Sequence, residues 1–330
     1  MWILENNTPF PVERTWITDK RGVMHWVVVV KGTYLINPDG FAVPAEKQEE
    51  ICRVSMYRGE PGTSSLIYES DFMFVKPATD IILNGHAYAL DGKPCPQVDV
   101  TMKVAGITKT LRVFGDRFWE KGATGFKATA PEPFGKMSVV YERAYGGMDK
   151  RSDDTEKHGW EPRNPVGVGF TLEPENLTGQ RLPNIEYPDQ DFHRPAGFGP
   201  IAPHWSPRRE LAGTYDETWQ NERFPLVPMD FDERFYLCAP EDQQVQGHLN
   251  GGEPVALYNL TPGGLLSFEL PRVSIRFVTS FYGKEDVEHC ATIQTIILEP
   301  DVPRMIILWA TCLSCHHDVL KLKATAVCAD

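Results

Sequence analysis

The sequence predicts an all-β or β-rich protein with two antiparallel sheet lobes, sandwich- or barrel-like, joined by an ordered, proline- and glycine-rich loop layer with a few short helices. Segments near both ends of the 330-residue chain alternate apolar and polar residues, as half-buried strands do. The part between them holds 14 of the 27 prolines, which interrupt strand ladders. It also holds four of the eight tryptophans, which disordered chains rarely carry. The predicted boundaries are 1–115, 116–250 and 251–330.

Two hairpins are predicted in the N-terminal lobe. Apolar segments at 26–36 and 41–45 flank the turn sequence NPDG, whose proline and glycine favour a tight reversal. The second hairpin joins VDVTMKV (98–104) to ITKTLRV (107–113) across Ala105 and Gly106. Alternation continues through both segments, so we expect antiparallel pairing.

Two short helices are predicted in the central layer. The first covers 206–213, with Ser206 as the cap, Pro207 at the first helical position and Gly213 as the stop. The second starts at TYDETW, where Thr214 and Glu217 fit a capping box. The glycines of YERAYGG and NPVGVG are interpreted as turn residues with positive φ rather than as phosphate-binding loops.

The C-terminal lobe is predicted to be a four-stranded meander. Its strands are 272–281, 291–298, 305–311 and 319–327. If 293–298 pairs with 305–312 across the LEPDVPR turn, opposed residue numbers sum to about 603. That register places Cys290 beside Leu313.

Composition and charge restrict the function. A net charge of −12 disfavours a nucleic-acid partner, because neutralising phosphates requires clustered Lys and Arg. No apolar run approaches the length of a membrane span, and the N-terminus lacks the pattern of an export signal. We therefore expect a cytoplasmic protein without membrane or nucleic-acid partners.

The stretch CLSCHH raises the question of a cofactor. It matches the C-x-x-C-H pattern of covalent haem attachment, which the expected compartment disfavours. A C-x-x-C knuckle is also half of a zinc site, but no second such pair completes it, so no cofactor is expected and zinc stays an alternative. The alternative interpretation is that Cys290 and Cys312 are buried strand residues and that His316 and His317 are turn residues. If a metal binds, the ligands come from His289, Cys290, Cys312, Cys315, His316 and His317.

Carboxylates suggest a hydrolase as the alternative function. Asp216, Asp230 and Asp232 lie near Tyr215 and Trp219 in the sequence, and a glycosidase uses such a pair of acids with aromatic sugar platforms. The competing interpretation is a helix cap and a solvated turn. No G-x-S-x-G, P-loop or dinucleotide glycine pattern is present.

Several longer stretches resemble a bacterial family known as domain of unknown function 2169. The resemblance runs from about residue 6 to 320 and is carried by DFMFVKPATDIILNGHAY, RVFGDRFW, YERAYGGMD, NPVGVG, LPNIE, GFGPIAPHWSPRRELAGTYDETW and FPLVPMDFDERFYLCAPEDQ. CLSCHH is not part of the pattern. Members look like cytoplasmic accessory proteins of type VI secretion, encoded beside PAAR-like spike-tip proteins or toxins with such a domain. The resemblance implies an adaptor or chaperone that loads this cargo onto the spike trimer, and it supplies no catalytic residue.

For such an adaptor we expect a docking surface with aromatic anchors and arginines. The sequence places the candidates in the central layer. They are Arg117, Trp119, Tyr145, Trp205, Arg208, Arg209, Tyr215 and Trp219. The alternative is that Trp119, Tyr145 and Trp219 pin loops to the core, and that Arg117 pairs with Asp116.

Overall fold

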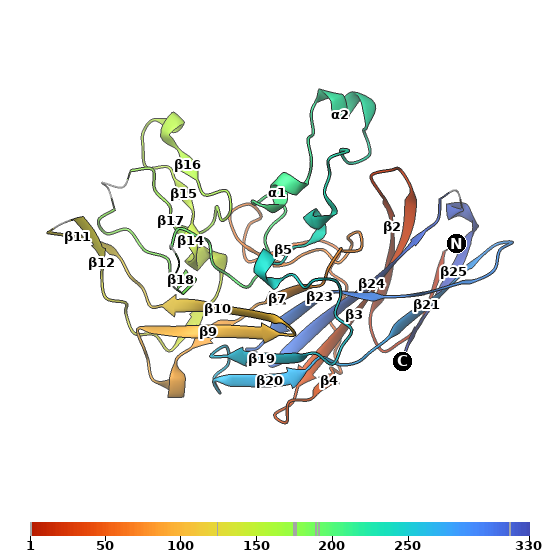
Figure 1. Ribbon diagram of the computed structural model, residues 1–330, viewed down its shortest axis with the longest axis horizontal. Coiled ribbons are helices and arrows are strands. Elements are labelled where there is room, and N and C mark those ends of the chain that lie inside the picture. The colour runs from red at the N-terminus through yellow and green to blue at the C-terminus, as the bar shows by residue number, and fades with distance from the viewer. Residues whose placement is uncertain (1, 124, 174–176, 189, 191, 317) are drawn as a thin grey trace.

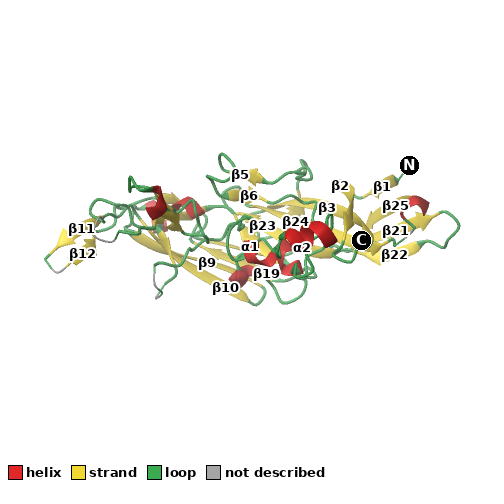
Figure 2. Ribbon diagram, turned by 90° about the horizontal axis from the view of Figure 1, so that it is seen from above, coloured by secondary structure: helices red, strands yellow, loops and turns green. Residues whose placement is uncertain are grey.

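The structure is a computed structural model that describes residues 2–123, 125–173, 177–188, 190, 192–316 and 318–330. Within these residues the chain forms several separate sheets with two short α-helices (Figure 1). The β-rich prediction is confirmed. Figure 2 shows the hairpin of β11 (Trp119–Gly122) and β12 (Gly125–Ala128) at one end of the long axis and the strands of both chain termini at the other.

The largest sheet crosses the middle of the molecule. Its order is β2-β3-β24-β23-β7, and β4 also pairs with β3. All neighbours are antiparallel except β7 and β23, which run parallel. The strands are β2 (Val12–Thr18), β3 (Met24–Ile36), β4 (Ala42–Pro44), β7 (Asp80–Leu83), β23 (Thr292–Glu299) and β24 (Arg304–Ser314).

The β3 strand explains why its sequence does not alternate. Trp26, Val28 and Val30 belong to the main hydrophobic core, whereas Val27 and Val29 belong to a second core on the opposite face of the sheet. Because both faces are covered, every position of WVVVV is apolar.

Two further sheets complete the body. A five-stranded sheet has the order β18-β10-β9-β19-β20, and a four-stranded sheet has the order β1-β25-β21-β22. The strands of the first are β9 (Gln97–Val104), β10 (Ile107–Phe114), β18 (Ile185–Glu186), β19 (Pro254–Tyr258) and β20 (Leu265–Glu269). Those of the second are β1 (Ile3–Asn7), β21 (Ile275–Phe281), β22 (Val287–Cys290) and β25 (Leu322–Ala329).

The sheets do not follow the predicted segments 1–115, 116–250 and 251–330. The central sheet combines β2, β3, β4 and β7 from the first segment with β23 and β24 from the last, and the five-stranded sheet draws on all three. The predicted pairing within each hairpin is nevertheless present. β9 pairs with β10, β3 with β4, and β23 with β24 from Leu298↔Met305 to Thr295↔Leu308, which is the predicted register.

The prediction of a four-stranded C-terminal meander is wrong. β21 pairs with β22 and β25, whereas β23 leaves that sheet and lies between β24 and β7. Burial gives the reason. Nearly every residue of β23 is buried, so it needs cover on both faces, while β21 alternates buried and more exposed positions and suits an outer sheet.

The described part of the central segment is built from short ladders, as its predicted order requires. Its turns require glycine where the chain doubles back. Gly147 has φ +97°, and a Cβ atom there would lie 2.4 Å from the Gly167 carbonyl oxygen. Its short strands are β11 (Trp119–Gly122), β12 (Gly125–Ala128), β13 (Lys136–Ser138), β14 (Tyr145–Gly146), β15 (Met148–Asp149), β16 (Gly159–Trp160) and β17 (Val168–Gly169). Three more short strands lie before it, β5 (Met56–Tyr57), β6 (Leu66–Tyr68) and β8 (His86–Tyr88).

Both predicted helices are present, with different starts. α1 spans Arg208–Leu211 and follows Pro207, and Ser206 bonds the Glu210 carboxylate rather than the backbone. α2 spans Glu217–Glu222, and its cap is Asp216, whose Oδ1 accepts from the Trp219 amide at 2.8 Å. The predicted capping box at Thr214 is wrong, because the Thr214 hydroxyl donates to Asp230 and not to the helix backbone.

Candidate functional site

The segment 206–236, which we call the arm, carries both helices and stands away from the sheets (Figure 1). It begins at Ser206 and ends with the 3₁₀ turn Glu233–Tyr236. Several residues that the sequence singled out lie on it. The arm is therefore the first candidate for a functional surface.

Arg208 closes the base of the arm. Its Nε and Nη2 donate to the Phe235 carbonyl oxygen at 3.0 and 2.9 Å, and its Nη1 donates to the Glu69 carboxylate at 2.6 Å and to the Ile201 carbonyl oxygen at 2.6 Å. Only 3% of the residue is exposed. A buried arginine with these partners holds structure together and is not available for docking.

Hydrogen bonds along the arm fix its shape. The Trp219 indole nitrogen donates to the Leu226 carbonyl oxygen at 2.8 Å. Thr214 donates through its amide and its hydroxyl to Asp230, at 3.1 and 2.8 Å. Arg223 donates to the carbonyl oxygen of Lys20, outside the arm. The arm is thus ordered before any partner binds.

Large apolar side chains are exposed on this frame. Tyr215 packs edge-on against Trp219 with ring centroids 4.7 Å apart, and Trp219 packs edge-on against Phe224 at 5.8 Å. We call Tyr215, Trp219 and Phe224 the arm tip. Tyr215 is 53% exposed and Phe224 68%, and Met229 on the same arm is 67% exposed. An exposed apolar cluster of this kind is typical of an interaction surface.

The charges of the arm are mainly acidic. Residues 206–236 contain seven acidic residues and four arginines, a net charge of −3. Arg208 is buried, and Arg234 is paired with Asp232 at 2.6 Å. Asp216, Glu217 and Glu222 are exposed beside the tip. The aromatic tip is therefore bordered by negative charge.

The three carboxylates proposed for a hydrolase have structural partners. Asp216 caps α2. The pKa of Asp230 is lowered by hydrogen bonds from the Thr214 backbone and side chain, and that of Asp232 by the hydrogen bond from Arg234. A general acid at neutral pH requires a raised pKa. Asp230 and Asp232 are shifted in the opposite direction.

The remaining residues of the predicted docking set differ in burial. Arg117, Tyr145 and Trp205 are buried, like Arg208, which removes four of the eight from any docking surface. Arg117 bonds the Pro183 carbonyl oxygen at 2.6 Å and pairs with Glu186, not with Asp116 as suggested. Trp119 is half-buried beside Phe192. Arg209 and Tyr215 are exposed and Trp219 is half-buried.

The residues proposed as metal ligands are dispersed. His289 bonds the hydroxyls of Thr279 and Thr311 at 2.8 and 2.7 Å, and burial lowers its pKa to about 4. Cys290 is exposed and pairs across the sheet with Arg276, not with the residues near Leu313.

The C-x-x-C cysteines have separate surroundings. The Cys312 sulfur lies 3.3 Å from His25 Nδ1, whereas buried Cys315 contacts the Leu313 carbonyl oxygen at 3.5 Å. His316 is exposed, and His317 lies outside the described residues. In the described part of the chain, no three His, Cys, Asp or Glu side chains are arranged to hold a metal ion.

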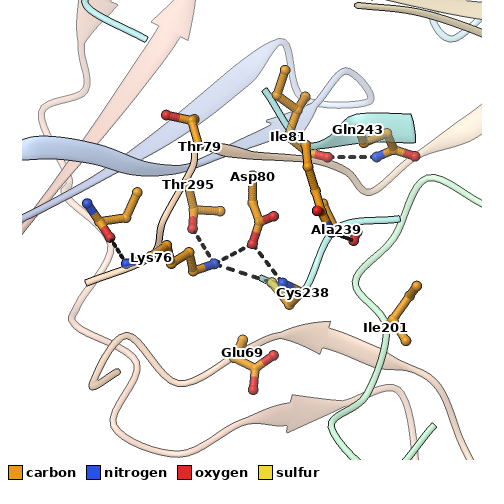
Figure 3. Close-up of polar contacts among 12 residues, drawn as sticks. Glu69, Lys76, Thr79, Asp80, Ile81, Ile201, Cys238, Ala239, Gln243 and Thr295 are labelled. Carbon is orange, nitrogen blue, oxygen red and sulfur yellow. Dashed lines mark hydrogen bonds and ion pairs between the residues drawn. The ribbon is translucent and has the colours of Figure 1, made fainter. Parts of the chain in front are cut away.

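A buried polar cluster lies between the central sheet and the chain at Cys238, just after the arm (Figure 3). Lys76 Nζ contacts the Asp80 carboxylate at 2.6 Å, the Thr295 hydroxyl at 2.9 Å and the Cys238 sulfur at 3.5 Å. The Cys238 amide donates to the same Asp80 oxygen at 2.7 Å, and the other Asp80 oxygen has no hydrogen-bond partner among the residues that the structure describes. We call Lys76, Asp80, Cys238 and Thr295 the Lys76 cluster.

The Lys76 cluster is charged although it is buried. Burial alone would lower the pKa of Lys76, but the ion pair with Asp80 outweighs it and the net shift is upward. Burial raises the pKa of the Cys238 thiol. Lys76, Cys238 and Thr295 line a cavity of about 30 Å³, more than the roughly 10–15 Å³ that one water molecule needs. Sequence reasoning missed this site, for which the only signal was a lysine inside the apolar stretch FMFVKP.

Comparisons with known proteins give one family. A family model described as an uncharacterized protein conserved in bacteria, DUF2169, matches residues 21–310. Neither the comparison with curated proteins nor that with solved structures gave a significant match. Among the described residues, the helices are all too short or too polar to cross a membrane.

Proposed function

This chain belongs to the DUF2169 family of bacterial proteins, whose model matches residues 21–310, and we propose that it is a cytoplasmic adaptor of type VI secretion. Its partner is a PAAR-like spike-tip protein, or a toxin that carries such a domain. The adaptor holds this cargo and assists its loading onto the spike trimer. The secretion role rests on the resemblance of the sequence motifs, and the binding role rests on the arm.

The observation that carries the binding role is the exposed arm tip. Tyr215, Trp219 and Phe224 form one ring-on-ring cluster on a segment whose backbone is held by hydrogen bonds. Aromatic side chains supply large contact areas at small entropic cost. Because the arm is already ordered, binding does not require the free energy of folding it.

Charge indicates the kind of surface that the arm tip fits. Asp216, Glu217 and Glu222 are exposed beside the tip, and the whole chain has a net charge of −12. A partner with an apolar pocket bordered by Lys or Arg would match this pattern and associate faster at low salt.

Co-purification tests the proposal. The tagged protein is expressed with its neighbouring genes, purified gently, and its companions are identified by mass spectrometry. We expect a PAAR-like protein or toxin in near-equal amount. Purification of the tagged protein alone, at high yield, contradicts the adaptor role.

Two variants test the surface in the same assay. Tyr215→Ser combined with Phe224→Ser should weaken partner binding by at least about tenfold, with the melting temperature unchanged. The matched control is Leu320→Ser, which removes an exposed apolar side chain, 87% accessible, far from the arm in the sequence. Retained binding by the double variant would exclude the arm tip while leaving the adaptor role standing.

A further inference from the structure

The contact between Lys76 and Cys238 brings an amine and a thiol together inside the protein. Their nitrogen and sulfur atoms are 3.5 Å apart, although the residues are 162 positions apart in the chain. Both are buried and point toward each other in Figure 3. All seven cysteines are free, so Cys238 has no disulfide. The nucleophile nearest to its sulfur in this network is the Lys76 nitrogen.

We propose that Lys76 and Cys238 are a modification site, at which dioxygen joins them by a covalent N–O–S link. The lysine ammonium, the cysteine thiol and one dioxygen molecule give the link, one water molecule and one proton. The ammonium first releases one proton. One N–H and one S–H bond are then replaced by N–O and O–S bonds, and the two hydrogens from these broken bonds leave with the second oxygen atom as water. Nitrogen and sulfur each lose two electrons, and dioxygen accepts all four.

The surroundings supply what this reaction needs. The lysine must lose its charge, and the Asp80 oxygen without a partner can accept the released proton. The Thr295 hydroxyl holds Nζ at 2.9 Å and keeps it beside the sulfur. Cys238 and Lys76 both line the cavity of about 30 Å³, which has room for a molecule as small as dioxygen.

The link would connect two parts of the fold that the arm depends on. Cys238 follows the 3₁₀ turn that ends the arm, and Lys76 precedes β7 of the central sheet. A covalent bond across 162 positions restricts the unfolded chain strongly. The oxidised protein should therefore resist unfolding better than the reduced protein. This inference does not depend on the proposed secretion role.

Peptide mapping of the whole protein tests the link. The protein is purified in air and, in parallel, without oxygen and with reductant, and both samples are digested with trypsin. Proline follows Lys76 and Lys93, so trypsin leaves 59–103 intact, and Cys238 lies in 235–272. We expect these two peptides joined in the aerobic sample only, about 14 Da heavier than their sum, and separated by dithiothreitol.

The mass separates this link from other oxidation. Peptide 59–103 also contains Cys95, and a disulfide to Cys238 would be about 2 Da lighter than the sum. Exposed Cys290 serves as the internal control for general oxidation. Lys76→Arg and Cys238→Ser should each abolish the joined peptide. Each should also abolish the greater resistance of the aerobic sample to unfolding by urea. The proposal is overturned if aerobic Cys238 stays a free thiol, or forms sulfinic acid beside unmodified Lys76, in a sample where Cys290 is oxidised.

Discussion

The guanidinium of Arg208 donates two hydrogen bonds to the carbonyl oxygen of Phe235, which lies 27 positions later in the chain. This contact makes the first helix and the last turn of the arm one unit, and the ion pair to Glu69 attaches that unit to the body. The presentation of the arm tip thus depends on a residue that no partner can reach.

Arg208→Ala should lower the free energy of unfolding by about 3–5 kcal/mol, because it leaves the Glu69 carboxylate without its cation. Urea unfolding measures this change. The neighbouring Arg209→Ala removes an exposed arginine and should stay within about 0.5 kcal/mol. Equal effects of the two substitutions would contradict the anchoring role of Arg208.

Asp216→Ala should destabilise α2 by about 1 kcal/mol, because the Trp219 amide loses the carboxylate that caps it. The denaturation midpoint reports the loss. Glu217→Ala, one position later and exposed, controls for the removal of a negative charge and should cost less. Thr214→Val would lower the denaturation midpoint more than Asp216→Ala only if Thr214 were the cap of α2.

His289 should make stability depend on pH between about 4 and 6.5. Its folded pKa is lowered by burial to about 4 from 6.5, so in this range the unfolded chain binds more protons than the folded one. Stability is therefore full above pH 6.5 and is lost as the pH falls toward 4, by about 1–2 kcal/mol after allowing for partial exposure.

His289→Gln removes the titrating ring, so the difference in unfolding free energy between variant and parent measures this contribution. We expect the variant to lose less stability than the parent between pH 6.5 and 4. A constant difference across that range would mean that His289 is already protonated, or exposed, in the folded protein.

Gly147→Ala should cost more than about 2 kcal/mol, since it adds a backbone clash 2.4 Å from the Gly167 carbonyl oxygen to the penalty of a positive φ. Thermal unfolding measures the loss. Gly179 also has a positive φ, +79°, with open space around its Cβ position, so Gly179→Ala isolates the penalty of conformation alone, about 1 kcal/mol. The two variants losing equal stability would argue against the close approach.

Hairpins were the part of the fold that local sequence could predict. The two strands of β9–β10 or β23–β24 are joined by a short turn and carry compatible patterns, so pairing follows from nearest neighbours. The assignment of β23 to the central sheet could not be predicted in this way, because its neighbour β7 lies more than two hundred positions earlier.

The candidate site was also predicted only in part from the sequence. Residue type drew attention to Tyr215 and Trp219, which lie in the arm tip, but it could not separate them from Trp205, which is fully buried. Aromatic and arginine side chains serve equally well in a core and at an interface. Only the burial of each residue distinguishes those two roles.

By itself, the sequence determined the β-rich class, the hairpin registers, the order of the described part of the proline-rich centre, and the family, because these depend on local periodicity, turn residues and shared motifs. The tertiary structure decided how strands from both ends of the chain mix in one sheet, which arginines and aromatics stay exposed, and that Lys76 meets Cys238. The physical reason is that burial and contact between distant residues depend on how whole sheets pack together, and no local pattern records that packing.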